Sequence, residues 1–231
     1  GCSVTDPAGV QAMVEQVMAE WGRIDILVNN AGILRDKSFS KMSLDDFRLV
    51  VDVHLMGSVY TTKAVWDIMR EQGYGRIVFT TSSSGLYGNF GQSNYGAAKM
   101  AVVGLMQTLS LEGEKNNIRV NCLAPTAATR MTEDLLPADL LKLLTPESVT
   151  PGLLALVAED APTRAILCAG AGAFGAAHVT LTDGVVIKPV AAAAEQVVAQ
   201  WDAIQDRAGE VVPGSGMVQT QGQLTKVMSA L

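Results

Sequence analysis

Residues 75–125 read GRIVFTTSSSGLYGNFGQSNYGAAKMAVVGLMQTLSLEGEKNNIRVNCLAP, and this stretch decides the fold. Residues 76–80 and 118–123 are short, mostly apolar runs, so we expect a strand in each. Between them lie a loop rich in serine and glycine and a helix expected over 94–114. Strand, helix and strand in this order predict a βαβ unit, in which parallel strands lie in a sheet covered by helices.

The same alternation continues upstream of this unit. Asp6 followed by Pro7 is typical of a helix start, and Gly22 ends the helical spacing of apolar residues that follows. We expect a strand over residues 24–28 and a long helix over about 43–69. These elements add a further strand and helix to the predicted sheet.

Downstream, prolines punctuate the chain between residues 125 and 162 and predict short helices there. Residues 165–169 and 178–182 are candidate strands, and the tail from 190 to 231 is expected to be helix, loop, helix. The predicted fold class is therefore α/β, a Rossmann-like, doubly wound parallel sheet with helices on both faces. We expect a single domain over 1–231, with 190–231 as a C-terminal helical extension.

Composition narrows the function classes. The chain has 231 residues, 48% of them hydrophobic, which suits one domain with a large core. Its formal charge of −6 offers no basic footprint for nucleic acid. Cys2, Cys122 and Cys168 form no CxxC pair, so we expect reduced thiols and no metal site. No apolar run approaches the roughly 18 residues of a membrane span, and a cytoplasmic protein without membrane partners is expected.

One pair of side chains indicates acid–base catalysis. Tyr95 and Lys99 are four residues apart, so on a helix they share a face and the ammonium can favour the ionised phenol. A phenol with a pKa near 10 is a poor base at neutral pH, and a nearby cation is the simplest remedy. Ser82 follows the strand at 76–80, where its hydroxyl could hold a substrate oxygen beside the tyrosine.

Two other sequence patterns do not indicate a functional site. A literal GxGxxG occurs at Gly170, Gly172 and Gly175, but residues 178–182 after it resemble a strand, whereas a phosphate-binding fingerprint must open a helix. We interpret these glycines as a turn after the last sheet strand. A serine hydrolase is also excluded, because Ser82 lies in no GxSxG elbow and no histidine completes a triad order.

Taken together, the motifs resemble those of the short-chain dehydrogenase/reductase family. The Asn29-Asn30-Ala31-Gly32 stretch matches the family's NNAG motif, and Ser82, Tyr95 and Lys99 match its catalytic serine, tyrosine and lysine. Thr126 replaces the glycine usual after the proline of the next motif. The resemblance implies that the cofactor is bound by Ser3, Val4, Asn30, Ala31, Gly32, Tyr95, Lys99, Pro125 and Thr129.

Within that family, the chain is most similar to the (R)-3-hydroxyacyl-CoA dehydrogenases of type 2 peroxisomal multifunctional enzymes and their bacterial relatives. The matching stretches include NNAGILRD at 29–36 and GLYGNFGQ at 85–92. Most of the family has an asparagine on the long helix that helps to hold a proton-relay water, and His54 stands at that position here. The resemblance implies a relay role for His54, while a histidine that only packs inside a helix is the alternative.

The resemblance further implies hydride transfer between NAD and a secondary alcohol or ketone, possibly a 3-hydroxyacyl-CoA. Tyr95 would be the general acid or base, Lys99 would lower its pKa and hold the nicotinamide ribose, and Ser82 would stabilise the reacting oxygen. NADP stays open, because the residue that normally selects between the two dinucleotides precedes Gly1 in the family layout. A homodimer or homotetramer is expected, and a peroxisomal location if the source is a eukaryote.

The family's glycine-rich phosphate-binding turn would come before the first residue of this sequence. Ser3 and Val4 match the end of the family's third strand, which usually touches the adenine. Two explanations stay open. The sequence is part of a longer enzyme, which we favour because loss of half the sheet would expose a strand edge. Alternatively, it is a truncated relative that acts as an interaction or scaffold protein.

Overall fold

The computed structural model of the chain describes residues 1–128 and 141–230. The chain divides into two compact units, Gly1–Ala177 and His178–Leu231, and each is described by itself. None of the helices in these described ranges is long and apolar enough to cross a membrane.

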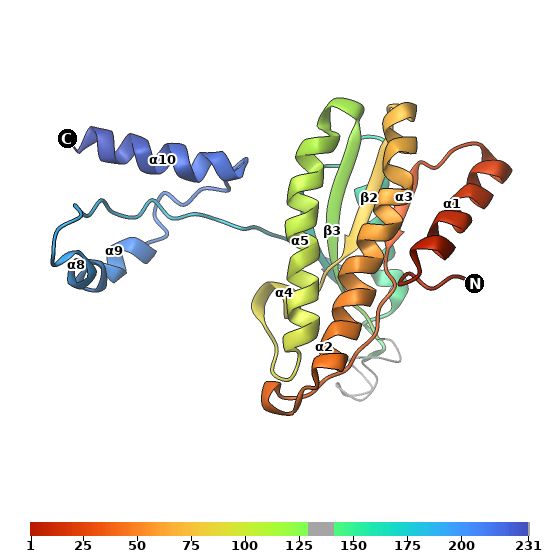
Figure 1. Cartoon of the computed structure of the whole chain (residues 1–231), viewed down its shortest axis with the longest axis horizontal. Coiled ribbons are helices and arrows are strands. Elements are labelled where there is room, and N and C mark those ends of the chain that lie inside the picture. The colour runs from red at the N-terminus through yellow and green to blue at the C-terminus, as the bar shows by residue number, and fades with distance from the viewer. Residues whose placement is uncertain (129–140, 231) are drawn as a thin grey trace. The chain divides into compact units, whose positions relative to one another are not determined.

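The first unit contains a five-stranded sheet whose spatial order follows the chain (Figure 1). Its strands are β1 (Ile26–Asn29), β2 (Gly75–Thr80), β3 (Ile118–Thr126), β4 (Ile166–Gly170) and β5 (Ala173–Ala177). Strands β1 to β4 run parallel, and β5 pairs antiparallel with β4. The predicted parallel sheet with helices on both faces is confirmed apart from the antiparallel β5. The strands expected at 24–28, 76–80 and 165–169 start one or two residues away from the predicted positions, and the strand expected at 118–123 starts at Ile118 as predicted.

The strand expected over residues 178–182 is wrong. The last strand lies earlier, at β5, because Ala171 and Gly172 both have positive φ, 51° and 76°, and form a two-residue turn that folds β5 back onto β4. Within 178–182 the structure has one isolated bridge, between Leu181 and Val211. The glycines of the GxGxxG pattern therefore belong to a hairpin, and no helix follows them, as the turn interpretation required.

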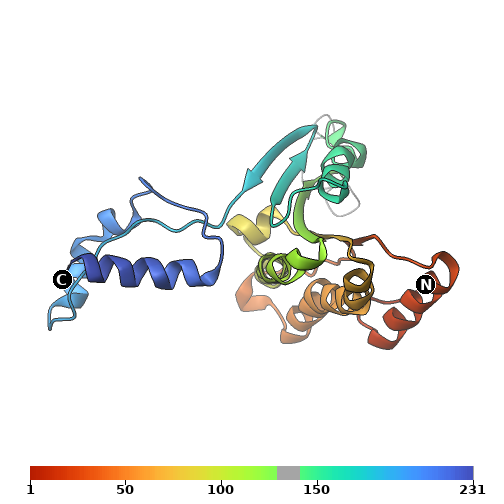
Figure 2. The ribbon, with the colours of Figure 1, turned by 90° about the horizontal axis from the view of Figure 1, so that it is seen from above.

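Helices cover both faces of the sheet (Figure 2). Those of the first unit are α1 (Pro7–Trp21), α2 (Leu44–Val51), α3 (Gly57–Gln72), α4 (Ser83–Tyr87), α5 (Ser93–Gly113) and α7 (Thr150–Val157), with short 3₁₀ turns η1 (Phe39–Lys41), η3 (Glu114–Asn116) and η4 (Pro146–Ser148). α3 packs on β1 and β2, α5 packs on β2 and β3, and α1 packs on α3. α7 packs on β2 and β3 from the other side.

The side chains of β2 show why both faces need a cover. Ile77 and Phe79 point into one apolar cluster with α3 and α5, while Val78 between them joins a second cluster with α7. All three are fully buried. Successive residues of a strand point to opposite faces, so a strand apolar at every position must be covered twice.

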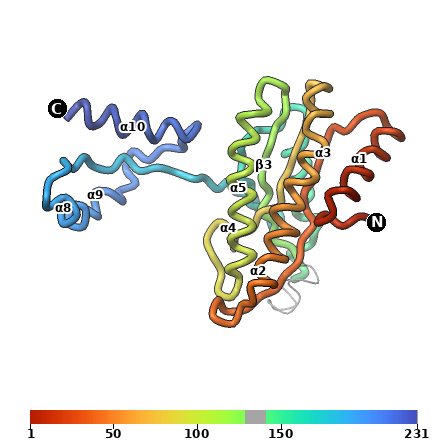
Figure 3. Tube along the Cα trace, in the orientation of Figure 1, coloured from red at the N-terminus to blue at the C-terminus, as the bar shows by residue number. Residues whose placement is uncertain are grey.

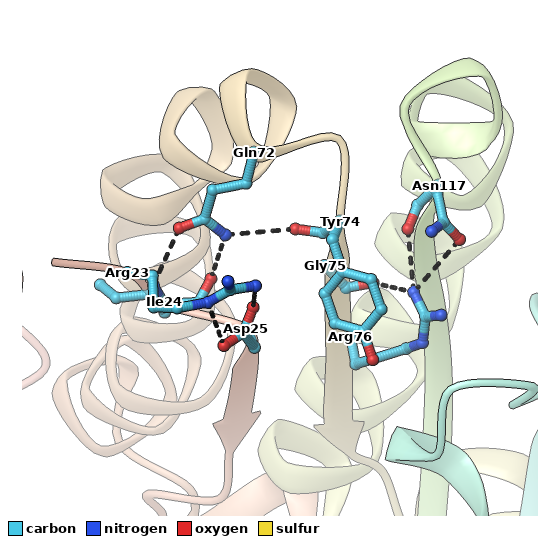
Figure 4. A network of polar contacts seen from close by, with 8 residues as sticks. All are labelled: Arg23, Ile24, Asp25, Gln72, Tyr74, Gly75, Arg76 and Asn117. Atoms are coloured by element: carbon cyan, nitrogen blue, oxygen red, sulfur yellow. Dashed lines mark hydrogen bonds and ion pairs between the residues drawn. The ribbon is translucent and has the colours of Figure 1, made fainter. Parts of the chain in front are cut away.

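The amino ends of β1 and β2 are tied together by polar side chains (Figure 4). Gln72 accepts a hydrogen bond from the Ile24 amide at 3.0 Å and donates one to the Ile24 carbonyl at 2.7 Å. Arg76 is fully buried, and its guanidinium donates to the carbonyls of Ala158, Glu159 and Asn117 at 2.9, 2.6 and 2.9 Å. A buried cation held by backbone carbonyls joins three segments far apart in the sequence.

The second unit contains the helices α8 (Ala193–Ala199), α9 (Trp201–Gln205) and α10 (Gly216–Ser229). None of its described residues is buried. Lys226 of α10 pairs with Asp183 at 2.5 Å, and the Leu181–Val211 bridge joins two of its extended segments. The assignment of 190–231 as an extension of one domain stays a prediction, since the second unit begins twelve residues earlier, at His178.

Candidate active site

Tyr95 and Lys99 lie on the first turns of α5, at the carboxyl edge of the sheet. The Lys99 ammonium lies 5.6 Å from the centroid of the Tyr95 ring and donates a hydrogen bond of 2.5 Å to the carbonyl of Thr80, the last residue of β2. The Lys99 side chain is buried, and this burial lowers its pKa to about 8. Tyr95 and Lys99 therefore share a face of α5 as expected, and the Lys99 ammonium is bound by the last carbonyl of β2.

Ser82 lies against the phenol of Tyr95. Its hydroxyl caps α4 by accepting a hydrogen bond of 3.2 Å from the Ser84 amide, and it also hydrogen-bonds with the Tyr95 side chain. Burial raises the pKa of Tyr95, the bond with Ser82 opposes this rise, and the carboxylate of Asp36 adds to it. These groups favour a protonated phenol at neutral pH, so the lowering of this pKa by Lys99 stays a prediction.

His54 lies next to the same phenol because the long helix widens there. Residues Asp52–Met56 form a π-helical segment (η2) between α2 and α3, and Figure 3 shows the trace passing through it without a break. Such segments often occur at functional sites. The His54 and Tyr95 rings meet edge to face, with centroids 5.1 Å apart.

The surroundings of His54 keep its imidazole neutral. Its Nε2 lies 2.8 Å from the carbonyl oxygen and 3.1 Å from the amide nitrogen of Ile33, while its buried Nδ1 has no hydrogen-bond partner among the described residues. Burial, together with the charge of Lys99, lowers the pKa of His54 to about 4. The ring thus has one nitrogen in use and one open for a proton or a hydrogen bond.

The NNAG stretch begins at Asn29, the last residue of β1, and its Gly32 lies against the His54 ring. A Cβ atom on Gly32 would lie 2.4 Å from Cε1 of His54, so only glycine permits the approach of the ring. Asn30 accepts a hydrogen bond of 2.9 Å from the Thr80 hydroxyl. Asn29 accepts from the Thr61 hydroxyl at 2.5 Å and donates to Thr62 at 3.1 Å, which fixes the end of β1 on α3.

The remaining predicted residues are less closely grouped. Val4 packs against Gly57 at the start of α3, where a Cβ would lie 2.7 Å from its Cγ2, and the Ser3 hydroxyl bonds to that of Thr5 at 2.8 Å. Ala31 is exposed after β1, and Pro125 pairs with Ala169 near the end of β3. Thr129 lies outside the described residues. The structure therefore brings Ser82, Tyr95, Lys99 and His54 together, with Asn30 and Gly32 beside them.

Two polar residues just before Tyr95 were not predicted. The fully buried Asn94 donates to the Arg35 carbonyl at 3.0 Å, and its oxygen accepts from the Tyr95 amide at 2.7 Å. Gln92 donates to Asp36 at 2.7 Å and accepts from the Ser84 hydroxyl at 2.7 Å. Both anchor the segment after the NNAG stretch to the start of α5. Their sequence signal, polar residues around the start of a helix, is also common in ordinary loops and helix caps.

The residues present fit one half of a nicotinamide dinucleotide. Lys99 and Tyr95 bring an ammonium and a phenol side by side at the sheet edge, a donor pair suited to ribose hydroxyls. Among the described residues, no glycine-rich turn opens a helix toward a pyrophosphate. The fit is therefore to the nicotinamide ribose end.

Known proteins resemble this chain in both sequence and structure. Residues 1–139 match the model of the family described as short chain dehydrogenase. The chain is 48% identical over 179 residues to the peroxisomal multifunctional enzyme type 2 of Mus musculus, covering 77% of this chain and 24% of the relative. It is 44% identical over 214 residues to a short-chain type dehydrogenase/reductase of Mycobacterium tuberculosis, covering 92% and 74%.

Two solved structures have the same fold. The full-length peroxisomal multifunctional enzyme type 2 of Drosophila melanogaster superposes with a TM-score of 0.81 at 35% identity, over 96% of this chain and 40% of that one. A short chain dehydrogenase of Mycobacterium avium gives 0.77 at 30% identity, over 90% and 74%. The chain thus spans about a quarter of the mouse protein and about three quarters of the mycobacterial ones. It belongs to the short-chain dehydrogenase family of oxidoreductases.

Proposed function

We propose that the protein transfers hydride between NAD(H) and a secondary alcohol or ketone. The observation that supports this most directly is the grouping of Ser82, Tyr95 and Lys99 at the carboxyl edge of a parallel sheet, where open α/β sheets bind ligands. The nicotinamide supplies or accepts the hydride when bound. Family members use NAD(H) or NADP(H), and the choice of NAD rests on the subgroup resemblance alone.

In this proposal the protein's own residues handle the proton. Tyr95 donates its phenolic proton to a ketone oxygen, or removes the hydroxyl proton of an alcohol, while the Ser82 hydroxyl hydrogen-bonds to the same oxygen. Lys99 holds the ribose and, as a cation beside the phenol, stabilises its ionised form. His54, whose neutral ring lies edge to face with Tyr95, exchanges this proton: it takes one from the phenol after alcohol oxidation and returns one after ketone reduction.

A 3-hydroxyacyl-CoA or the matching 3-oxo compound is the substrate class that we propose. The names of relatives support it: a peroxisomal hydratase-dehydrogenase-epimerase of Saccharomyces cerevisiae is 45% identical over 199 residues, and an acetoacetyl-CoA reductase of Acinetobacter is 40% identical over 158.

We also propose a homo-oligomer. Trp66, Leu105 and Leu109 line a groove of about 170 Å³ on the outer side of α3 and α5, which a second copy could cover.

The test is reduction of acetoacetyl-CoA with NADH, and with NADPH in parallel, followed by the loss of reduced-nicotinamide absorbance. Tyr95→Phe should lower kcat by about 10²-fold to 10⁴-fold, because it removes the general acid and keeps the ring. Tyr87→Phe is the matched control, since Tyr87 is 73% exposed at the end of α4. A Tyr95→Phe variant as active as wild type would overturn the proposal.

A further inference from the structure

The hydroxyl of Thr81 makes an unusual bond beneath the site. Thr81 follows β2 directly, is 1% exposed, and donates a hydrogen bond of 2.6 Å to the backbone carbonyl of Lys99. Its amide donates to the Leu123 carbonyl at 2.8 Å, so its backbone is fixed to β3. Since the preceding residue, Thr80, accepts from the Lys99 ammonium, two consecutive residues hold Lys99 at both its carbonyl and its ammonium.

This bond is not needed to satisfy the helix. Lys99 lies well inside α5, where a backbone carbonyl already accepts the amide of the residue four positions later. Thr81 therefore uses the second lone pair of that oxygen. Burying a hydroxyl is costly unless it is bonded, and a valine of the same shape would fill this position without that cost. Packing alone does not explain why residue 81 has a hydroxyl, whereas a role in positioning Lys99 does.

The neighbouring glycine supports the same interpretation. A Cβ on Gly85 would lie 2.8 Å from Cβ of Lys99 and 2.9 Å from its carbonyl carbon, so α4 and α5 touch at this lysine. Ser82 caps the start of α4, three residues before Gly85. Because Thr81 lies between β2 and Ser82, its bond to Lys99 fixes the distance between the serine and the lysine across the phenol of Tyr95.

We propose that Thr81 is a positioning residue, whose hydroxyl holds Lys99 in register with Ser82 and Tyr95. The proposal rests on the proposed function for its effect on turnover. Its geometric part can be tested without turnover. Thr81→Val removes the hydroxyl and keeps the shape, and Thr81→Ser keeps the hydroxyl. Thr108→Val is the control: it removes an exposed hydroxyl of α5, the helix of Lys99, that bonds to the Gly104 carbonyl at 3.3 Å.

The first experiment follows ionisation of the Lys99 ammonium by NMR of its side chain, with Lys99→Met to identify the signal. A displaced ammonium is less buried, so in Thr81→Val it should titrate at a pH higher than the wild-type value of about 8 by roughly half a unit or more. Thr81→Ser and Thr108→Val should titrate as wild type does. Equal titration of Thr81→Val and wild type would overturn the proposal, and this result does not depend on any hydride transfer.

The second experiment is a double-mutant cycle on kcat. Thr81→Val should lower kcat by about tenfold in the wild-type background, as expected for a small misplacement of a catalytic group. In a Lys99→Met background it should have no further effect, because its role acts through Lys99. Equal losses in both backgrounds would indicate a general effect on packing and refute the proposal. Absence of turnover in wild type counts against the proposed function alone, and the Lys99 titration still decides the role of Thr81.

Discussion

Lowering the pH from 7 to 4 should destabilise the protein through His54, because its buried ring must gain a proton. The pKa of His54 falls from an ordinary value of 6.5 to about 4 in the folded protein, mainly through burial. Between these values the unfolded chain binds a proton that the folded chain does not, so stability decreases as the pH falls. At roughly 1.4 kcal/mol per pH unit, the loss amounts to about 3 kcal/mol.

Urea unfolding of wild type and His54→Gln at several pH values measures this loss. Carboxylates contribute to acid destabilisation in both proteins, so the relevant quantity is the difference between the two pH dependences. Wild type should lose about 3 kcal/mol more than His54→Gln between pH 7 and 4. Parallel curves would refute the reasoning. The ring can also be observed directly by NMR in His178→Gln, where His54 is the only histidine left.

Three further predictions concern stability. Gly32→Ala should lower the free energy of unfolding in urea by about 1–3 kcal/mol, because its Cβ meets the His54 ring. Gly104→Ala, in open space on α5, should raise it by about 0.5–1 kcal/mol. Similar values for the two variants would contradict this. Arg76→Met should lower the free energy of unfolding by about 3 kcal/mol or more, since it leaves buried carbonyls without a donor. Its control, Arg70→Met at an exposed arginine, should change the same quantity by less than about 1 kcal/mol. The pKa of Lys99 is about 8 in the folded protein and 10.5 in the unfolded chain, so the unfolded chain binds the extra proton between these values. Between pH 8 and 10.5 the free energy of unfolding of wild type should therefore rise by about 3 kcal/mol relative to that of Lys99→Met. A difference between the two proteins that does not change with pH would refute this.

The strands and the catalytic candidates follow from local patterns. β2 and β3 are apolar runs bounded by glycine, serine and asparagine, and the helix between them has the right length for a crossover. The spacing of Tyr95 and Lys99 predicts a shared helix face, and Ser82 follows the preceding strand. Because parallel strands end at one edge, these residues had to come close together.

Other features depend on contacts that local patterns do not encode. The π-helical segment at His54 has an ordinary helical sequence, DVHLM, and its widening accompanies the packing of the ring against Gly32. The buried Arg76 is stabilised by carbonyls more than eighty residues away, so a charged residue in an apolar strand gave no hint of them. β5 has the sequence AFGAA, without β-branched residues, and its strand results from the hairpin turn before it.

The state of Tyr95 links the geometry to the direction of the reaction. Burial and Asp36 favour a protonated phenol, which is the form that donates a proton to a ketone. Acting as a base on an alcohol requires the opposite form, and the cation nearest at hand is the Lys99 ammonium, now hydrogen-bonded to the Thr80 carbonyl. In the proposed mechanism, the position of this ammonium between carbonyl and phenol would set the balance between acid and base. Residues that fix it, such as Thr81, would therefore modulate the chemistry of the phenol.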